Sequence, residues 1–127
     1  MSYDNNNIFA KILRGEVPCD KIYEDEYVLS FYDVNPQKKI HALVIPKGKY
    51  TNLDDFNENA SEKEILGFFR GVTLVAKKLG ISINNGNGYR TLSNIGSDGG
   101  QEVPHLHFHI FGGCLLYTSP SPRDGTK

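Results

Sequence analysis

Residues 103–113 read VPHLHFHIFGG and place three of the four histidines of the chain at alternate positions. In an extended strand, successive side chains point to opposite faces, so residues two apart share a face. We therefore expect His105, His107 and His109 to line one face of a strand. The apolar residues between them would enter the core from the other face: Leu106, Phe108 and Ile110. The stretch predicts a strand with one apolar face and one row of imidazoles.

Three explanations for the imidazole row are open at this point. The histidines could face solvent on a purely structural strand. They could hold a metal ion, because His-x-His on a strand is a usable ligand pair, with a further ligand from Glu102, His41 or Asp33. Finally, a neutral imidazole is a competent nucleophile at phosphorus, and its neighbours can supply donors to the developing charge of a phosphoryl group.

The segment before the strand favours the third explanation. Residues 94–105 read NIGSDGGQEVPH, and glycines there allow backbone N–H groups to approach an anion without a side chain in the way. The segment is not a P-loop, because the pattern GxxxxGK[ST] is absent. A glycine loop alone is weak support, but beside three aligned histidines it predicts a phosphate site.

The composition indicates one ordinary globular domain. The 127 residues carry a net charge of −1, which gives no electrostatic reason to bind nucleic acid or an anionic membrane. No apolar run is long enough to span a bilayer, and the N-terminus MSYDNNNIF lacks the features of a secretory signal. Cys19 and Cys114 have no framework spacing, so we expect reduced thiols in a cytoplasmic protein.

The remaining pattern predicts an α+β fold. A short amphipathic helix is expected at 8–16, and a long one at 61–79 that opens with a capping box of Ser61 and Glu64 and ends at Gly80. Runs of β-branched and aromatic residues predict antiparallel strands at 21–25, 26–34, 40–46, 88–95 and 105–111. We expect a sheet of about five strands covered on one face by the long helix, within a domain at 1–113. The SPSP-containing residues 114–127 predict a loose tail.

Four stretches together resemble the histidine triad (HIT) family of nucleotide hydrolases and transferases: IFAKI, FYDVNPQ, HALVIPK and GSDGGQEVPHLHFHIFGG. The double glycine after the triad and the GSDGGQ before it are similar to the Hint branch rather than to the Fhit-like dinucleoside polyphosphate hydrolases. The resemblance runs from about residue 8 to residue 113. It implies the HIT-like fold and a two-fold homodimer in which the sheet extends across the interface. The tail CLLYTSPSPRDGTK does not resemble that of Hint relatives, and we interpret it as foreign sequence.

The resemblance also implies a role for each histidine. His107 would attack the α-phosphate, and His109 would contact that phosphate. His105 would help to orient and protonate the group, and His41 would support the nucleophile by hydrogen bonding. By itself, the sequence allows Asp33 to be a simple turn residue, but in relatives an aspartate there binds the ribose hydroxyls.

Further substrate-binding positions follow from the same resemblance. Asn94, Gly100 and Glu102 match positions around the phosphate and leaving group. Many relatives have Ser or Thr in place of Glu102, and a carboxylate there would repel a phosphate unless it turns away or meets an amine. The purine would be surrounded by four apolar residues: Ile8, Phe9, Phe31 and Val34.

The activity implied is hydrolysis of the P–N bond of adenosine or guanosine 5′-phosphoramidates through a nucleotidyl-histidine. No cofactor or metal is expected, and the Cys-x-x-Cys zinc pair of many HIT proteins is missing near the N-terminus. The expected partners are AMP or GMP derivatives and a second copy of the chain. Two alternatives are hydrolysis of dinucleoside polyphosphates and a nucleotide-binding regulatory module with incidental catalysis.

Overall fold

The computed structural model describes residues 2–113, so the predicted tail lies outside the described residues. Within them, three helices and five strands follow one another along the chain. Their bounds are α1 Ile8–Leu13, β1 Lys21–Glu24, β2 Val28–Tyr32, β3 Ile40–Pro46, α2 Leu53–Asn59, α3 Glu62–Lys78, β4 Arg90–Leu92 and β5 Phe108–Gly112. The predicted α+β fold with a five-stranded antiparallel sheet is confirmed.

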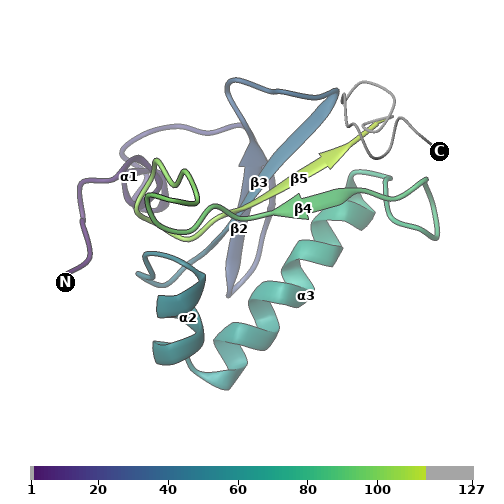
Figure 1. Cartoon of the computed structure of the whole chain (residues 1–127). Helices are drawn as coiled ribbons and strands as arrows, with labels where there is room; N and C mark the ends of the chain where they lie inside the picture. The colour runs from purple at the N-terminus through teal and green to yellow at the C-terminus, as the bar shows by residue number, and fades with distance from the viewer. Residues whose placement is uncertain (1, 114–127) are drawn as a thin grey trace.

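The five strands form one sheet in the order β1-β2-β3-β5-β4 (Figure 1). The last of the described strands, β5, therefore lies inside the sheet, between β3 and the short edge strand β4. Its register places His109 opposite Leu43 of β3 and opposite Leu92 of β4. His109 is thereby held between two neighbouring strands.

Alternation along the strands divides the core between the two faces of the sheet. Val28, Ala42 and Val44 pack with α3 on one face, together with Leu106 and Ile110. On the other face, Phe9 of α1 packs with a second group of strand residues: Leu29, Phe31, Leu43 and Ile45. The long helix covers one face of the sheet and α1 lies on the other (Figure 1). The histidine row belongs to the face on which α1 packs.

The long helix begins and ends as its sequence predicts. Ser61 caps the N-terminus, its side chain accepts from the backbone N–H of Glu64, and the Glu64 side chain returns a bond to the N–H of Ser61. Gly80 follows the helix with a φ of +76°, a conformation that glycine adopts at little cost.

The sequence pattern did not predict the short helix α2. In α2 only Phe56 is buried, so no apolar stripe marks it, although Asn52 caps it by accepting from Asp55 N–H.

The strands that carry the site are shorter than predicted. The ladder of β5 begins at Phe108 rather than at His105, because backbone groups before it bond to loop residues instead. The N–H of Leu106 donates to the carbonyl of Tyr50, and the hydroxyl of Ser93 donates to the carbonyl of His107. For the same reason β4 ends at Leu92, one residue before Ser93.

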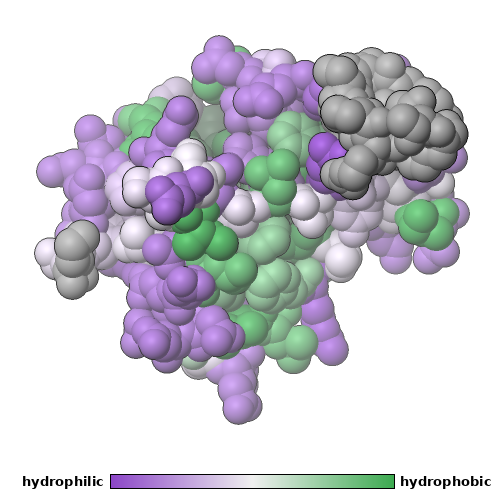
Figure 2. Space-filling view, in the orientation of Figure 1, coloured by the Kyte–Doolittle hydropathy of each residue, from purple (hydrophilic) through white to green (hydrophobic). Residues whose placement is uncertain are grey.

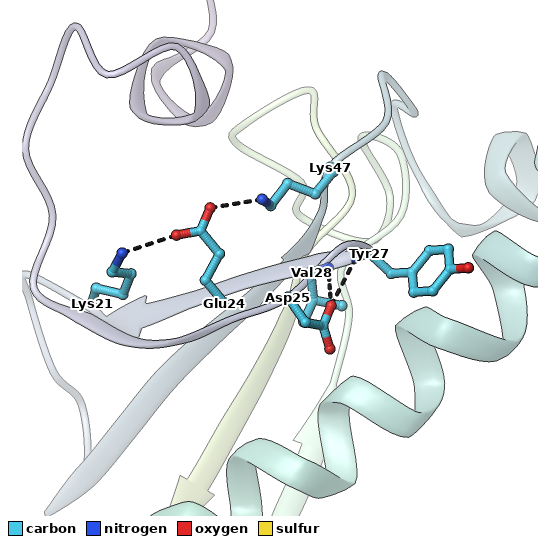
Figure 3. A network of polar contacts seen from close by, with 6 residues as sticks. All are labelled: Lys21, Glu24, Asp25, Tyr27, Val28 and Lys47. Carbon is cyan, nitrogen blue, oxygen red and sulfur yellow. Dashed lines mark hydrogen bonds and ion pairs between the residues drawn. The ribbon is translucent and has the colours of Figure 1, made fainter.

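A charged network ties the β1–β2 hairpin to the end of β3 (Figure 3). Glu24 accepts from Lys21 at 2.9 Å and from Lys47 at 2.7 Å, and these two lysines lower its pKa to about 2. Asp25 closes the turn by accepting from the N–H groups of Tyr27 and Val28. An open surface hollow of about 720 Å³ lies beside this network and contains none of the histidines. The network therefore stabilises the hairpin and takes no part in the histidine site.

The helices among residues 2–113 are too short or too polar to cross a lipid bilayer.

Candidate active site

His41 and His109 are joined by a hydrogen bond of 2.9 Å between Nε2 of His41 and Nδ1 of His109. The other nitrogen of His41, Nδ1, lies 3.1 Å from the backbone N–H of Gln37, which can only donate. In the neutral ring Nε2 must then carry the hydrogen, and it donates to His109. The hydrogen of His109 is therefore on its own Nε2. The backbone amide of Gln37 thus fixes the tautomer of His41 directly and that of His109 through His41.

Asp33 stands beside this pair. Its Oδ2 lies 3.4 Å from Nε2 of His41, while its Oδ1 accepts from the backbone N–H of Asn35 at 2.8 Å. The backbone N–H of Asp33 also donates to the carbonyl of His41. Asp33 is therefore a turn residue, as one reading of the sequence expects, and it also lies beside the histidine pair; binding of ribose by its carboxylate stays a prediction.

His107 is oriented by its own strand. Its Nδ1 lies 2.7 Å from the backbone carbonyl of His105, a group that can only accept, so Nδ1 carries the ring hydrogen. Nε2 then holds the lone pair, and nothing within residues 2–113 hydrogen-bonds to it. The ring lies 5.2 Å from that of His109, centroid to centroid. A nitrogen with an available lone pair is thereby set beside a ring whose Nε2 carries a hydrogen.

His105 is fully buried, and both of its ring nitrogens are engaged. Nε2 lies 3.0 Å from the carbonyl of Pro46, and Nδ1 is bonded to the hydroxyl of Tyr3. A ring in this position has no nitrogen left for a substrate. The implied role of His105 in protonating the bound group does not fit this arrangement, and the ring instead anchors the backbone that holds His107.

The implied role of His41 also needs a correction. Its hydrogen bond goes to His109, the last histidine of the triad, rather than to the nucleophile His107. The reason lies in the register: His41 is opposite Phe111 and Leu43 is opposite His109, so the nearest imidazole across the ladder is that of His109. His41 can support His107 only through His109.

Burial lowers the pKa of all four histidines. Loss of hydration lowers the pKa of His105 to about 4, with the nearby His107 adding to the effect. It does the same for His109, whose pKa also falls to about 4, with His107 and His41 as further causes. For His107 and His41 desolvation again lowers the pKa, and the Asp33 carboxylate opposes it. The cluster is therefore neutral at neutral pH, as a nucleophilic imidazole requires.

Two buried aromatic rings connect the histidines to the expected purine pocket. Phe9 of α1 lies edge-on to Phe31 at 5.6 Å and to His107 at 4.9 Å, measured between ring centroids. The other two apolar residues expected around the purine lie at the surface: Ile8 is 41% and Val34 is 89% exposed. The structure thus places two of the four expected residues in the core, with Phe9 beside His107, and two at the surface.

The glycine loop is held by bonds within itself. Asn94 donates to the carbonyl of Gly99 at 2.7 Å, and Gly100 N–H donates to the carbonyl of Ser97. Gly100 has a φ of +75°, which favours glycine. The N–H groups of Gly96 and Gln101 are also used inside the loop, so these amides and that of Gly100 are not directed at an anion. Glu102 is exposed at the end of the loop.

The metal explanation can be tested against the hydrogen bonds. Ligand atoms of Asp33, His41 and His109 all lie within 4.8 Å of one another, which is close enough for one ion. However, the Gln37 N–H holds the hydrogen of His41 on Nε2, the atom that faces the other two groups. A ligand nitrogen must present a lone pair, so the tautomer favours a hydrogen-bond chain at this position.

The structure adds contacts of the site that the sequence patterns did not indicate. Tyr3 and Ser93 contact the triad directly, and Gln101 ties the glycine loop to the carbonyl of Thr51 at 2.7 Å. Asn7 carried a usable signal, because an asparagine directly before an amphipathic stretch is a common helix cap, and here it accepts from Ala10 N–H. No periodicity or spacing marks Tyr3.

Known proteins share this fold and much of this sequence. The family described as HIT domain matches residues 14–114. A 13.2 kDa HIT-like protein of Azospirillum brasilense is 55% identical over 115 residues, covering 91% of this chain and 92% of the relative. A HIT family hydrolase of Clostridium thermocellum has a TM-score of 0.79 at 34% identity, covering 94% of this chain and 98% of that one. A histidine triad nucleotide-binding protein of Candida albicans has a TM-score of 0.72 at 32% identity, covering 83% and 73%. The chain belongs to the HIT family.

Proposed function

We propose that this protein is a purine nucleoside phosphoramidase, which hydrolyses the P–N bond of adenosine or guanosine 5′-phosphoramidates. The observation that carries the proposal is the bond from Nδ1 of His107 to the carbonyl of His105, because it directs the lone pair to Nε2 and fixes the ring. Similarity to a solved HIT family hydrolase supports hydrolysis, and similarity to a solved nucleotide-binding histidine triad protein supports a nucleotide as substrate.

The reaction would proceed by two displacements. Nε2 of His107 attacks the α-phosphorus, a His107–phosphorus bond forms and the P–N bond breaks. The departing amine needs a proton, and Nε2–H of His109 is the donor beside the reacting atoms. Binding of an anionic phosphate would raise the pKa of His109 from its value near 4 and favour a protonated ring. Water then attacks phosphorus, the His107–phosphorus bond breaks, and the proton of that water returns to Nε2 of His109. The nucleotide is released with both rings restored, and one difficult step is split into two easier ones.

Hydrogen bonds to neighbouring backbone groups prepare this site before substrate binds. The tautomer of His107 is set by a carbonyl, and that of His41 by an amide. His107 keeps its tautomer and orientation as it attacks, so little reorganisation is required of the nucleophile, whereas a protonated His109 would donate from Nδ1 and make His41 its acceptor. Asp33 would accept hydrogen bonds from the two ribose hydroxyls and place the α-phosphate over His107.

Trapping the intermediate tests the proposal. Purified protein is mixed with adenosine 5′-phosphoramidate in excess EDTA and quenched in base during turnover, and the peptide containing HLHFHIF is then analysed by mass. We expect an acid-labile, base-stable nucleotidyl adduct on His107, and we expect His107→Ala to abolish turnover while still binding AMP. Turnover that requires a divalent ion, or substantial activity without His107, would overturn the mechanism.

A substrate comparison separates the proposal from its two rivals. Faster turnover of an AMP phosphoramidate than of diadenosine polyphosphate supports the phosphoramidase, whereas the reverse order identifies a dinucleoside polyphosphate hydrolase. A partner-dependent cellular phenotype that survives His107→Ala would identify a regulatory module whose catalysis is incidental.

A further inference from the structure

We propose that Tyr3 is a positioning residue for the nucleophile, because its hydroxyl fixes the tautomer and orientation of His105 and thereby the carbonyl that holds His107. This inference rests on the proposed function, in which His107 attacks phosphorus. Tyr3 lies 102 residues from His105 in the sequence, and their side chains are joined by a hydrogen bond of 2.5 Å.

The direction of each hydrogen bond follows from its partners. The Pro46 carbonyl can only accept, so Nε2 of His105 carries the ring hydrogen and donates to it at 3.0 Å. In the neutral ring, Nδ1 must then accept, and the Tyr3 hydroxyl is the donor. The amide Nδ2 of Asn7 donates to the Tyr3 oxygen at 2.9 Å, which directs the phenolic hydrogen toward His105. In the series of hydrogen bonds Asn7–Tyr3–His105–Pro46, each group therefore donates to the next, and the reverse direction is excluded.

Loss of the Tyr3 hydroxyl would affect His107 because the two histidines are linked by the backbone carbonyl of His105. The same residue whose ring is held by Tyr3 and Pro46 supplies the carbonyl that accepts from Nδ1 of His107. Without the phenolic hydroxyl, Nδ1 of His105 would be an unsatisfied acceptor in a fully buried ring. The ring would gain a second tautomer, in which Nε2 presents a lone pair to the Pro46 carbonyl, and this repulsion would displace it. The His105 carbonyl would move with the ring, and Nε2 of His107 would no longer be held in one orientation.

The N-terminal segment reinforces the same two histidines by packing. Asn7, which orients the Tyr3 hydroxyl, also caps α1 by accepting from Ala10 N–H. The cap begins the helix that carries Phe9, and the Phe9 ring lies edge-on to His105 at 6.4 Å and to His107 at 4.9 Å between centroids. Residues 3–9 thus support the first two histidines of the triad from one side.

Replacing Tyr3 by phenylalanine tests the inference, because the ring and its edge-on contact with His105 are kept while the hydroxyl is lost. The matched control is Tyr23→Phe, which removes a hydroxyl bonded to Asp25 on the β1 hairpin, away from the triad. We expect Tyr3→Phe to lower kcat for the phosphoramidate about tenfold, as the loss of one buried hydrogen bond would, with the Kd for AMP within about twofold. The control should match the parent. The concentration of active sites is measured from the amount of nucleotidylated protein, and each rate is divided by it. A smaller folded fraction of the variant therefore cannot account for a lower kcat.

Nitrogen-15 NMR of the imidazoles gives a second readout, independent of activity. In the parent protein His105 should show the tautomer with hydrogen on Nε2, and Tyr3→Phe should show a mixture or the other tautomer. If the variant keeps the parent tautomer and the parent kcat, Tyr3 is not a positioning residue. If the parent protein does not turn over phosphoramidates, the proposed function fails, while the NMR comparison still decides whether Tyr3 fixes His105.

Discussion

His41 and His109 lie on neighbouring strands 68 residues apart in sequence, and a hydrogen bond of 2.9 Å joins them. Gln37 N–H donates to Nδ1 of His41, so Nε2 of His41 carries the hydrogen and donates it to Nδ1 of His109. The hydrogen of His109 is therefore on Nε2, and the His109 ring lies beside that of His107. The orientation of the proton donor in the proposed reaction is thus set by His41 on the neighbouring strand β3 and by Gln37 just before that strand.

Removing this support should slow chemistry more than binding. We expect His41→Ala to lower kcat about 10- to 100-fold with a small change in KM, because His109 would lose the hydrogen bond that orients its ring. His41→Gln should recover part of the loss, because a side-chain amide can still donate to Nδ1 of His109. Steady-state kinetics of both variants provide the comparison, and an equal loss in the two would show that the hydrogen bond is not the cause.

Replacing Asp33 should weaken nucleotide binding. Loss of a charge-assisted pair of hydrogen bonds to the ribose costs on the order of 1.5–3 kcal/mol, so Asp33→Ala should raise the Kd for AMP by one to two orders of magnitude. Calorimetry with AMP and its 2′,3′-dideoxy analogue isolates the contact. The parent protein should bind the analogue as weakly as the variant binds AMP; equal affinity of the parent for both nucleotides would contradict the role.

The buried neutral histidines should make the fold sensitive to mild acid. The pKa of His105 and that of His109 are about 4 in the folded protein, against about 6.5 in an unfolded chain, so the unfolded state binds more protons between these values. The free energy of unfolding should therefore be nearly constant above pH 7 and fall between pH 6.5 and 4 by roughly 2–3 kcal/mol on account of the buried His105, with a smaller, solvent-screened loss from the less buried His109. Urea titrations across this range measure the slope. His109→Asn should make it shallower, whereas an unchanged slope would assign the sensitivity to other groups.

A two-fold dimer through α3 and the region of β4 is expected from the exposed apolar side chains of the helix. Phe68 and Val72 are buried in the protein's own core, but Leu66 is 53% and Leu74 is 42% exposed. Apolar residues gather on the face that carries α3 (Figure 2). Leu66→Glu should convert the dimer to a monomer at micromolar concentration, as measured by light scattering. Val34→Glu, on an exposed apolar residue of another segment, is the control; a monomeric parent protein would refute the expectation.

Ser30 offers a prediction for stability alone. Its hydroxyl lies fully buried in β2, and among the described residues it has no hydrogen-bond partner. Ser30→Ala removes a desolvated polar group without leaving a large cavity, so the free energy of unfolding should stay unchanged or rise by up to about 1 kcal/mol. Urea denaturation measures this, and a clear loss of stability would indicate that the hydroxyl has a partner in solution.

Local sequence pattern predicted the five strands, two of the three helices and the strand face that the three triad histidines share. Alternation in residues 103–113 predicts opposite faces for the histidines and the apolar residues, because a strand repeats every two residues. The caps at Ser61 and Gly80 mark the long helix because they satisfy backbone groups within a few residues. Helix α2 was missed since it buries only one aromatic ring, and its short length gives no periodicity to read.

The direction of each hydrogen bond was decided only by the tertiary structure. The sequence presents four equivalent imidazoles, and nothing in their spacing tells which nitrogen of a ring holds its hydrogen. That choice depends on groups brought together by the strand order β1-β2-β3-β5-β4 and by the path of the N-terminal segment: the amide of Gln37, the carbonyls of Pro46 and His105, and the hydroxyl of Tyr3. Periodicity assigns a side chain to a face because it depends on neighbouring backbone geometry, whereas a tautomer depends on partners that are distant in sequence and adjacent only after folding.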